Sequence, residues 1–234
     1  MGKLGADGAT YKAIEFGGPA VSGLTMDDRM TICNMMAETG AKCAVMPGDS
    51  ITREYFDHQV SFVMPDDKAV YCETISIDLN VLEPMLALPH SVDTVAPVIL
   101  HANLPVQMGV LGTCTNGRLA DFRLALAVMG DLPLATGFEL LVIPASRRIY
   151  LDALREGIIE QLLLKGALIL PPGCGPCCGS SPGIPSAGEN IVSTANRNFI
   201  GRMGNVKANI YLASPATVAA CAVTGKMTSP AEGR

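Results

Sequence analysis

The sequence is poor in several residue types, and each shortage narrows the possible function. It has no tryptophan and only three histidines, and no histidine has a spaced partner of the kind expected in a catalytic or metal-binding pair. Its 17 lysines and arginines are spread along a chain of net charge −5. Because nucleic-acid phosphates are usually neutralised by a clustered basic surface, we expect no nucleic-acid binding.

Long apolar runs and an apolar leader are also missing. No run approaches the roughly 20 residues that a spanning helix needs, and the first residues include charges and glycines. We therefore expect a cytoplasmic protein with no membrane partner. Eight cysteines in such a chain favour reduced thiols or metal ligands over a disulfide framework. A composition of 49% apolar and 17% charged residues is typical of a soluble globular protein.

The first hundred residues predict a partial α/β domain, truncated at its start, followed by a linker. Thr25 can cap a helix whose apolar residues recur at helical spacing, and Gly40 can end it. The segment 86–97 contains two prolines and no periodicity, which favours an extended linker and a domain boundary near 95–105. The predicted elements before it are a helix over 25–39, a strand over 41–46, a helix near 50–57 and short strands near 69–78.

Residues 101–234 show a cleaner alternation of apolar strands and amphipathic helices. This pattern predicts an α/β domain with three α/β/α layers and a mostly parallel sheet, whose functional sites lie at the carboxyl ends of the strands. The predicted strands are 108–113, 138–143, 167–170 and 208–212, and the predicted helices are 118–129, 146–164 and 215–224. The loop 171–190 is long enough to be functional rather than a simple connection.

Three cysteines occur where two of these strands end. Cys114 lies in Gly112-Thr-Cys-Thr-Asn-Gly-Arg118, and Cys174 and Cys177 lie in Pro171-Pro-Gly-Cys-Gly-Pro-Cys-Cys-Gly179. Three soft ligands at one sheet edge suggest a metal cluster with an open coordination position.

Other interpretations of the cysteines remain open. The spacing of Cys174 and Cys177 is that of a thioredoxin-type redox motif, but the glycines and proline after Cys178 cannot continue the helix that such a motif needs. A structural zinc site would need a fourth ligand. The remaining cysteines favour packing in the core, as small apolar residues; they are Cys33, Cys43, Cys72 and Cys221.

Polar residues in two further segments suggest a binding site. Arg197 and Arg202 have no acidic neighbours in the sequence, so they could bind the carboxylates of a di- or tricarboxylate, or simply be exposed. Asn34 and Glu38 share one face of the first predicted helix. They could lie at a surface edge, or Glu38 could exchange a proton at the metal site.

Taken together, these motifs resemble the large subunit of the aconitase family, in particular its 3-isopropylmalate dehydratase branch. The resemblance covers nearly the whole chain. It rests on the ordered runs Asp7-Gly-Ala-Thr-Tyr11, Thr31-Ile-Cys-Asn-Met35 with Glu38, Gly112-Thr-Cys-Thr-Asn-Gly-Arg118, Val142-Ile-Pro-Ala-Ser146, Cys174-Gly-Pro-Cys177 and Asn196-Arg-Asn-Phe-Ile-Gly-Arg202.

The resemblance implies a fold like the aconitase iron-sulfur domain and a reversible hydro-lyase reaction on a malate-type acid, as in leucine biosynthesis. It implies that Cys114, Cys174 and Cys177 hold a [4Fe-4S] cluster whose fourth iron binds substrate. By the same matching, Glu38 would contact the substrate hydroxyl system. Asn34 and Asn196 would lie against the cluster, and Arg197 and Arg202 would bind substrate carboxylate.

The sequence also departs from the family pattern. Relatives carry an N-terminal domain with a catalytic histidine and aspartate, and a small (swivel) subunit or domain that supplies a serine base. We therefore expect this chain to correspond to the second half of a large subunit, to need a small subunit and a separate N-terminal domain chain, and to be inactive alone. Homoaconitase, aconitase, a dimethylmalate dehydratase and a non-catalytic cluster-binding module remain as alternatives.

Overall fold

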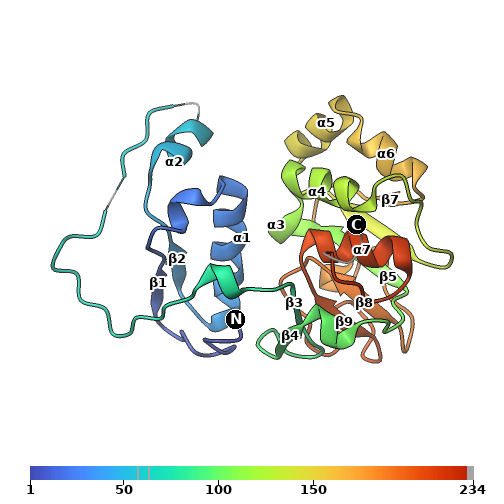
Figure 1. Ribbon diagram of the computed structural model, residues 1–234, viewed down its shortest axis with the longest axis horizontal. Coiled ribbons are helices and arrows are strands. Elements are labelled where there is room, and N and C mark those ends of the chain that lie inside the picture. Colours follow the sequence, from blue (N-terminus) through green and yellow to red (C-terminus); the bar gives the residue numbers. More distant parts are fainter. Residues whose placement is uncertain (57, 63, 231–234) are drawn as a thin grey trace.

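The computed structural model describes residues 1–56, 58–62 and 64–230. Its N-terminal part is built around one long helix, α1, and its C-terminal part around a seven-stranded sheet (Figure 1). Helix α1 lies on the side of the N-terminal part that faces the C-terminal part, where it contacts the short helix α3 (Thr113–Asn116). The contact between α1 and α3 brings residues from the N-terminal and C-terminal parts to one place.

Helix α1 spans Met26–Met36, and capping residues at its two ends determine where it begins and stops. Thr25 accepts a hydrogen bond from the backbone of Asp28, whose carboxylate accepts one from the backbone of Thr25, so the two residues form a capping box. A 3₁₀ turn, η2 (Ala37–Thr39), continues the helix until Gly40, which has a φ of 77°. The helix predicted over 25–39 is confirmed, since glycine adopts this left-handed conformation without steric cost.

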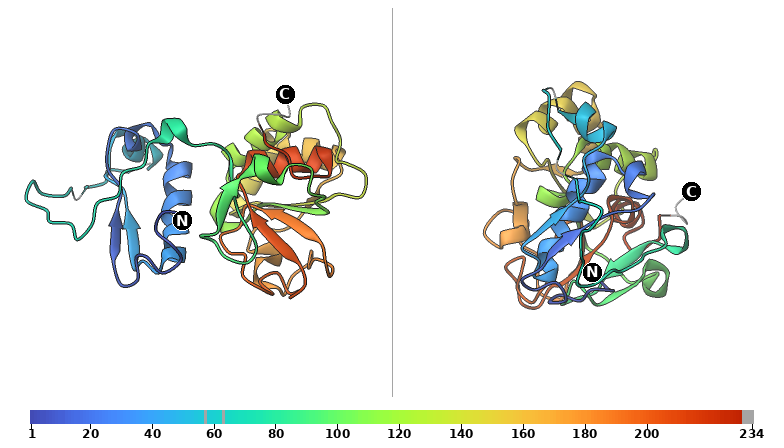
Figure 2. Two further views of the ribbon diagram at one scale, coloured as in Figure 1. Left: turned by 60° about the horizontal axis from the view of Figure 1, so that its bottom comes forward. Right: turned by 90° about the vertical axis from the view of Figure 1, so that its left-hand side faces the viewer.

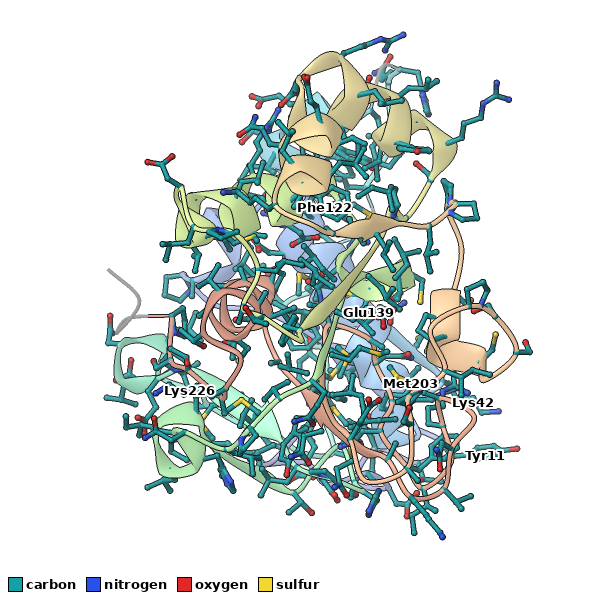
Figure 3. The ribbon with its side chains drawn as sticks, turned by 90° about the vertical axis from the view of Figure 1, so that its right-hand side faces the viewer. Tyr11, Lys42, Phe122, Glu139, Met203 and Lys226 are labelled. Carbon is teal, nitrogen blue, oxygen red and sulfur yellow. The ribbon has the colours of Figure 1, made fainter. Side chains whose placement is uncertain are left out.

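The rest of the N-terminal part is small. Strand β1 (Ala13–Glu15) pairs in parallel with β2 (Cys43–Val45), and helix α2 (Ser50–Tyr55) follows. Figure 3 shows Lys42 beside Tyr11, with the ammonium nitrogen 3.9 Å from the ring centroid. Arg29 of α1 is only 4% exposed and binds Asp49 before α2. This partly buried ion pair joins α1 to the segment that follows β2.

The strands predicted near 69–78 are wrong. Residues 64–78 contain no helix or strand and form a loop that projects from the N-terminal part, followed by the 3₁₀ turn η3 (Leu79–Val81) (Figures 1 and 2). Val70 is 94% exposed. The apolar residues of this loop therefore lack the burial that makes a strand stable.

The seven-stranded sheet has the order β4-β3-β9-β8-β5-β6-β7. The pairs among its last five strands in this order are parallel, and β3 is antiparallel to both of its neighbours. The strands are β3 (Met85–Ala87), β4 (Val95–Pro97), β5 (Met108–Gly112), β6 (Glu139–Ile143), β7 (Leu168–Ile169), β8 (Asn190–Ser193) and β9 (Asn209–Leu212). A mostly parallel α/β sheet is confirmed.

Side chains that alternate along the central strands form two buried clusters on opposite faces. One face is covered by helices, which Figure 1 shows gathered on one side of the sheet; they are α4 (Leu119–Met129), α5 (Arg147–Arg155), α6 (Ile158–Leu164) and α7 (Pro215–Thr224). Cys177 and Met203, from loops after β7 and β8, pack on the other face. Phe122 and Met203, both labelled in Figure 3, belong to the first and second cluster respectively.

Three details differ from the sequence predictions. Residues 86–97 are not a linker, because β3 and β4 pair as a hairpin at the edge of the sheet and β3 also pairs with β9. The helix predicted over 146–164 is two helices, broken at Gly157 with a φ of 70°. Strand β8 was not predicted. The division into 1–100 and 101–234 stays a prediction, although this pairing favours a boundary before β3.

Among the described residues, no helix has both the length and the hydropathy that a bilayer span requires.

Candidate functional site

Cys114 sits in a strained turn at the carboxyl end of β5. Gly112 has a φ of 120°, and a side chain there would collide with the carbonyl oxygen of Ile143, 2.0 Å away. Thr113 has a φ of 69°, which is rare for a β-branched residue. Thr194, after β8, receives a hydrogen bond from the Gly112 amide and donates one to the Gly112 carbonyl. Neighbouring strand ends therefore fix the direction in which α3 and its exposed Cys114 leave the sheet.

Cys174 and Cys177 follow β7, the next strand but one from β5 in the sheet. They belong to the 3₁₀ turn η5 (Gly175–Cys178), which Cys174 precedes and Gly179 ends with a φ of 74°. Cys174 is exposed, whereas Cys177 is 4% exposed and packs in the cluster on the second face of the sheet. The two thiols thus differ in burial although only two residues lie between them.

The three thiols lie close enough to influence each other's charge. Burial raises the pKa of the Cys177 thiol, the nearby Arg202 lowers it, and the sulfurs of Cys114 and Cys174 raise it further. Among the described residues, however, no three His, Cys, Asp or Glu side chains are grouped closely enough to hold a single metal ion. The chemistry of the donors, three thiols from two loops, is that of the ligands of iron–sulfur clusters.

Arg202 faces this set of thiols. Its Nη2 donates a hydrogen bond to the sulfur of Cys177 at 3.4 Å, and its guanidinium lies over the ring of Phe199. A positive charge at this distance favours the thiolate, which is the form that binds metals. Cys178 is exposed and its sulfur lies 3.2 Å from the Ser180 hydroxyl, which lowers the pKa of its thiol.

Glu38, Asn196 and Arg197 meet in one hydrogen-bonded group. Asn196 donates to Oε1 of Glu38 at 2.7 Å, and Nε of Arg197 donates to both carboxylate oxygens at 2.9 and 2.8 Å. The Glu38 side chain is 9% exposed and that of Arg197 is 41% exposed. Arg197 therefore has an acidic partner that its sequence neighbours do not supply, and Glu38 raises the pKa of its guanidinium.

Asn34 lies at the same junction, one turn before Glu38 on α1. Its Oδ1 is 3.5 Å from the hydroxyl of Thr115, which directly follows Cys114. The structure thus brings together all eight residues that the sequence suggested for the site, as two adjoining groups. In one group Cys177 contacts Arg202, and in the other α1 and the turn after it contact the loops that begin at Thr113 and Thr194.

Buried polar atoms without a partner are concentrated in these loops. In the described part of the chain, the buried side-chain nitrogen and oxygen atoms that have no hydrogen bond are Thr113 Oγ1, Ser181 Oγ, Asn198 Oδ1 and Arg202 Nε. Because native proteins leave few such atoms unpaired, their location in and beside the cysteine loops indicates a site built for a further polar or charged group.

Sequence reasoning missed several residues that shape the site. Thr194 and Thr31 carry no signal of their own, although Thr31 lies in a motif that the resemblance used and Thr194 lies two positions before another. The predicted core role holds for Cys221, which is fully buried, and is wrong for Cys43 and Cys72, which are exposed. Cys33 is partly buried. Whether a cysteine in a short apolar run is buried depends on which segment packs over it in the folded protein. Local sequence does not determine that packing.

Comparison with known proteins places the chain in a family. The family model described as aconitase family (aconitate hydratase) matches residues 1–103 and 99–225. Curated relatives named 3-isopropylmalate dehydratase large subunit are 47% identical over 234 residues in Thermotoga maritima, 43% over 236 residues in Lachnoclostridium phytofermentans and 44% over 237 residues in Archaeoglobus fulgidus. These alignments cover 97–99% of this chain and 56–57% of the relatives, so the chain spans little more than half of their length. The chain belongs to the aconitase family.

Proposed function

We propose that this chain is the cluster-bearing part of a hydro-lyase that reversibly dehydrates and rehydrates a malate-type acid, with 3-isopropylmalate as the substrate. The family assignment and the names of the relatives support this reaction class. The observation that carries the proposal is the convergence of three thiols with Glu38, Asn196 and Arg197 at the carboxyl edge of one parallel sheet.

Cys114, Cys174 and Cys177 would hold a [4Fe-4S] cluster. The donor set fits this group, because three soft ligands come from two loops, a guanidinium favours the thiolate of Cys177, and Arg202 keeps an unpaired buried Nε beside it. When bound, the cluster would supply a Lewis-acidic iron that polarises the oxygens of the substrate.

Glu38 is suited to proton transfer at the substrate. Asn196 and Arg197 together donate three hydrogen bonds to its carboxylate, which fixes the position of both oxygens. A general base must be held within hydrogen-bond reach of the proton that it takes. Because the side chain is nearly buried at the junction of α1 and the loop after β8, Glu38 can act only on a group bound at this edge of the sheet.

Arg197 and Arg202 would bind the carboxylates of the substrate. The hydrogen bonds of Arg197 to Glu38 use Nε, which leaves its two terminal nitrogens for a carboxylate, and the side chain is partly exposed. Arg202 differs, because Nη2 donates to Cys177 while its buried Nε has no hydrogen-bond partner. Paired N–H donors match the planar carboxylate in a two-point contact. Asn34 would complete the binding surface from α1.

The complete enzyme would need further polypeptide. Relatives are named as large subunits, which implies a small subunit, and the chain spans little more than half of their length. We propose that a small (swivel) subunit and a chain equivalent to the rest of the large subunit supply the missing catalytic groups, and that this chain alone has no turnover.

The experiment is a reconstitution assay. The chain with its cluster rebuilt anaerobically is mixed with the small subunit and the remaining large-subunit segment of a relative, and the loss of 3-isopropylmalate is followed by chromatography. We expect turnover only in the complete mixture, and none when Glu38→Gln replaces the wild type. An inactive complete mixture that contains an intact cluster would instead support a non-catalytic cluster-binding module.

A further inference from the structure

A polar stripe runs along the face of α1 that meets the C-terminal part. It consists of Asp27, Thr31, Asn34 and Glu38, whose spacings of four, three and four residues place them on one side of a helix. Asn34 and Glu38 belong to the proposed site. Asp27 and Thr31 have no role in it, yet both contact the segment that carries Cys114.

Arg118 is the residue that Asp27 and Thr31 share. It lies four residues after Cys114, and its side chain is only 11% exposed. Nε is 3.4 Å from Asp27, and Nη1 donates hydrogen bonds to the hydroxyl of Thr31 and to the backbone carbonyl of Thr115. One guanidinium therefore contacts two turns of α1 and the residue that follows Cys114.

The carbonyl oxygen of Thr115 accepts a second hydrogen bond, and this one comes from a residue of α1. Thr31 donates to it at 2.8 Å, so the two lone pairs of this oxygen are used by Thr31 and Arg118 together. On the other side of α3, Asn116 donates to the carbonyl of Thr194. The loop that carries Cys114 is thus held between α1 and the end of β8.

We propose that Arg118 is a positioning residue that joins α1 to the Cys114 loop and thereby fixes the distance between this cysteine and the polar side chains of α1. Lysine could replace its charge but not the arrangement, because a guanidinium directs several donors in one plane whereas an ammonium is a single point. The purpose of this fixed distance, to hold a cluster ligand next to Glu38, rests on the proposed function. The contacts themselves do not.

The simpler alternative is that Arg118 only neutralises the negative charge of nearby acidic side chains. Asp27 is one neighbour, and Asp121 accepts a hydrogen bond from the backbone nitrogen of Arg118. Thr31 separates the two explanations. Thr31→Val removes the hydroxyl without changing any charge and with little change in shape, whereas Thr31→Ser keeps the hydroxyl.

Hydrogen exchange of the metal-free chain, followed by mass spectrometry, tests the proposal directly. We expect exchange in residues 113–118 to become about five- to tenfold faster in Arg118→Lys and in Thr31→Val, as expected when a buried hydrogen bond of the usual strength is lost. Thr31→Ser should behave as the wild type. Arg123→Lys is the matched control on α4, because Arg123 is exposed and its guanidinium donates its hydrogen bonds to Glu156 rather than to residues 113–118.

Exchange in α7 shows whether a variant is destabilised as a whole, since α7 does not contribute to these contacts. If residues 113–118 exchange at the wild-type rate in both Arg118→Lys and Thr31→Val, the positioning role is wrong. If only the arginine variant changes, the hydrogen bond to Thr31 does not hold the loop, and the proposal that Arg118 joins it to α1 is wrong. Charge balance alone predicts no change in either variant, because lysine keeps the charge of Arg118.

A second measurement links the contacts to the cluster. After anaerobic reconstitution, iron loss to a chelator should be about five- to tenfold faster in Thr31→Val than in Thr31→Ser. Equal rates would mean that the cluster does not depend on this contact. If the wild type takes up no iron at all, the proposed function fails, whereas the exchange measurement still decides the role of Arg118.

Discussion

Replacing Gly117 by alanine is a sharp steric test of how the Cys114 loop is seated. Gly117 follows α3 with a φ of −103°, so its backbone is open to any residue and only the space around it matters. An added Cβ would lie 2.6 Å from the Ala145 nitrogen, 2.6 Å from the Thr113 carbonyl oxygen and 2.7 Å from that of Ile143. All three are backbone atoms, which cannot move aside as a flexible side chain can. The Cys114 loop must therefore shift away from the end of β6.

The magnitude follows from the cost of overpacking, which is about 1–3 kcal/mol in a close-packed interior. For a chain of this size, each kcal/mol lowers the melting temperature by about 2–4 °C, so Gly117→Ala should lower it by about 2–12 °C. Gly173→Ala is the matched control, because Gly173 lies beside Cys174 and has no atom within 4 Å of the added Cβ.

The assay is thermal unfolding of both variants by circular dichroism, together with their iron content after reconstitution. We expect Gly117→Ala to melt lower and to bind less iron, and Gly173→Ala to match the wild type in both. Equal melting temperatures for Gly117→Ala and the wild type would refute the close approach of α3 to the β6 end.

Three further predictions concern charge, substrate and core. Burial raises the pKa of Asp121 to about 6, so the native state keeps a proton that the unfolded state has lost. From pH 5 to pH 7 this lowers the free energy of unfolding by roughly 1 kcal/mol, and urea unfolding should detect that loss in the wild type but not in Asp121→Asn. An equal pH dependence in both proteins would contradict that pKa. Arg202→Lys should keep the cluster but weaken binding of 3-isopropylmalate about ten- to a hundredfold, because a charge-assisted two-point contact is lost. Binding can be titrated by electron paramagnetic resonance of the reduced cluster. An unchanged titration would show that Arg202 does not belong to the substrate site. Phe122→Ala should lower the free energy of unfolding by about 3–5 kcal/mol in denaturant unfolding, because the ring is fully buried in the helix-covered cluster. A loss below about 1 kcal/mol would be inconsistent with that burial.

The sequence predicted elements well where the signal is local. The α1 helix carries its own start and stop, namely the capping pair Thr25 and Asp28 and the glycine at position 40. Strands β5 and β6 are continuous apolar runs, as expected for parallel strands buried on both faces. In each case the residues that decide the structure lie within the element or next to it.

The failures share a dependence on distant partners. Residues 86–97 form two strands because β9, more than a hundred residues later, pairs with β3. Conversely, the apolar residues near 69–78 find no such partner and stay exposed. Sequence alone could not predict that a partner exists in one case and not in the other.

The candidate site shows the same division. The cysteines were found from their motifs, and Glu38 from its place on the polar face of the helix predicted over 25–39. The pairing of Glu38 with Arg197, 159 positions away, could not be predicted from neighbouring residues. Nor could the role of Arg118, which depends on α1 packing against the loop after β5.

Iron binding by cysteine variants tests the central claim most directly. The wild type and four single variants, Cys114→Ser, Cys174→Ser, Cys177→Ser and Cys43→Ser, are reconstituted anaerobically and their iron and visible absorption are measured. We predict about four irons per chain with broad absorption in the wild type and in Cys43→Ser, whose cysteine is exposed in β2, outside the three-thiol group. Each of the other three variants should lose the cluster. Full iron content and unchanged absorption in Cys174→Ser would contradict the assignment of these three thiols as the ligands.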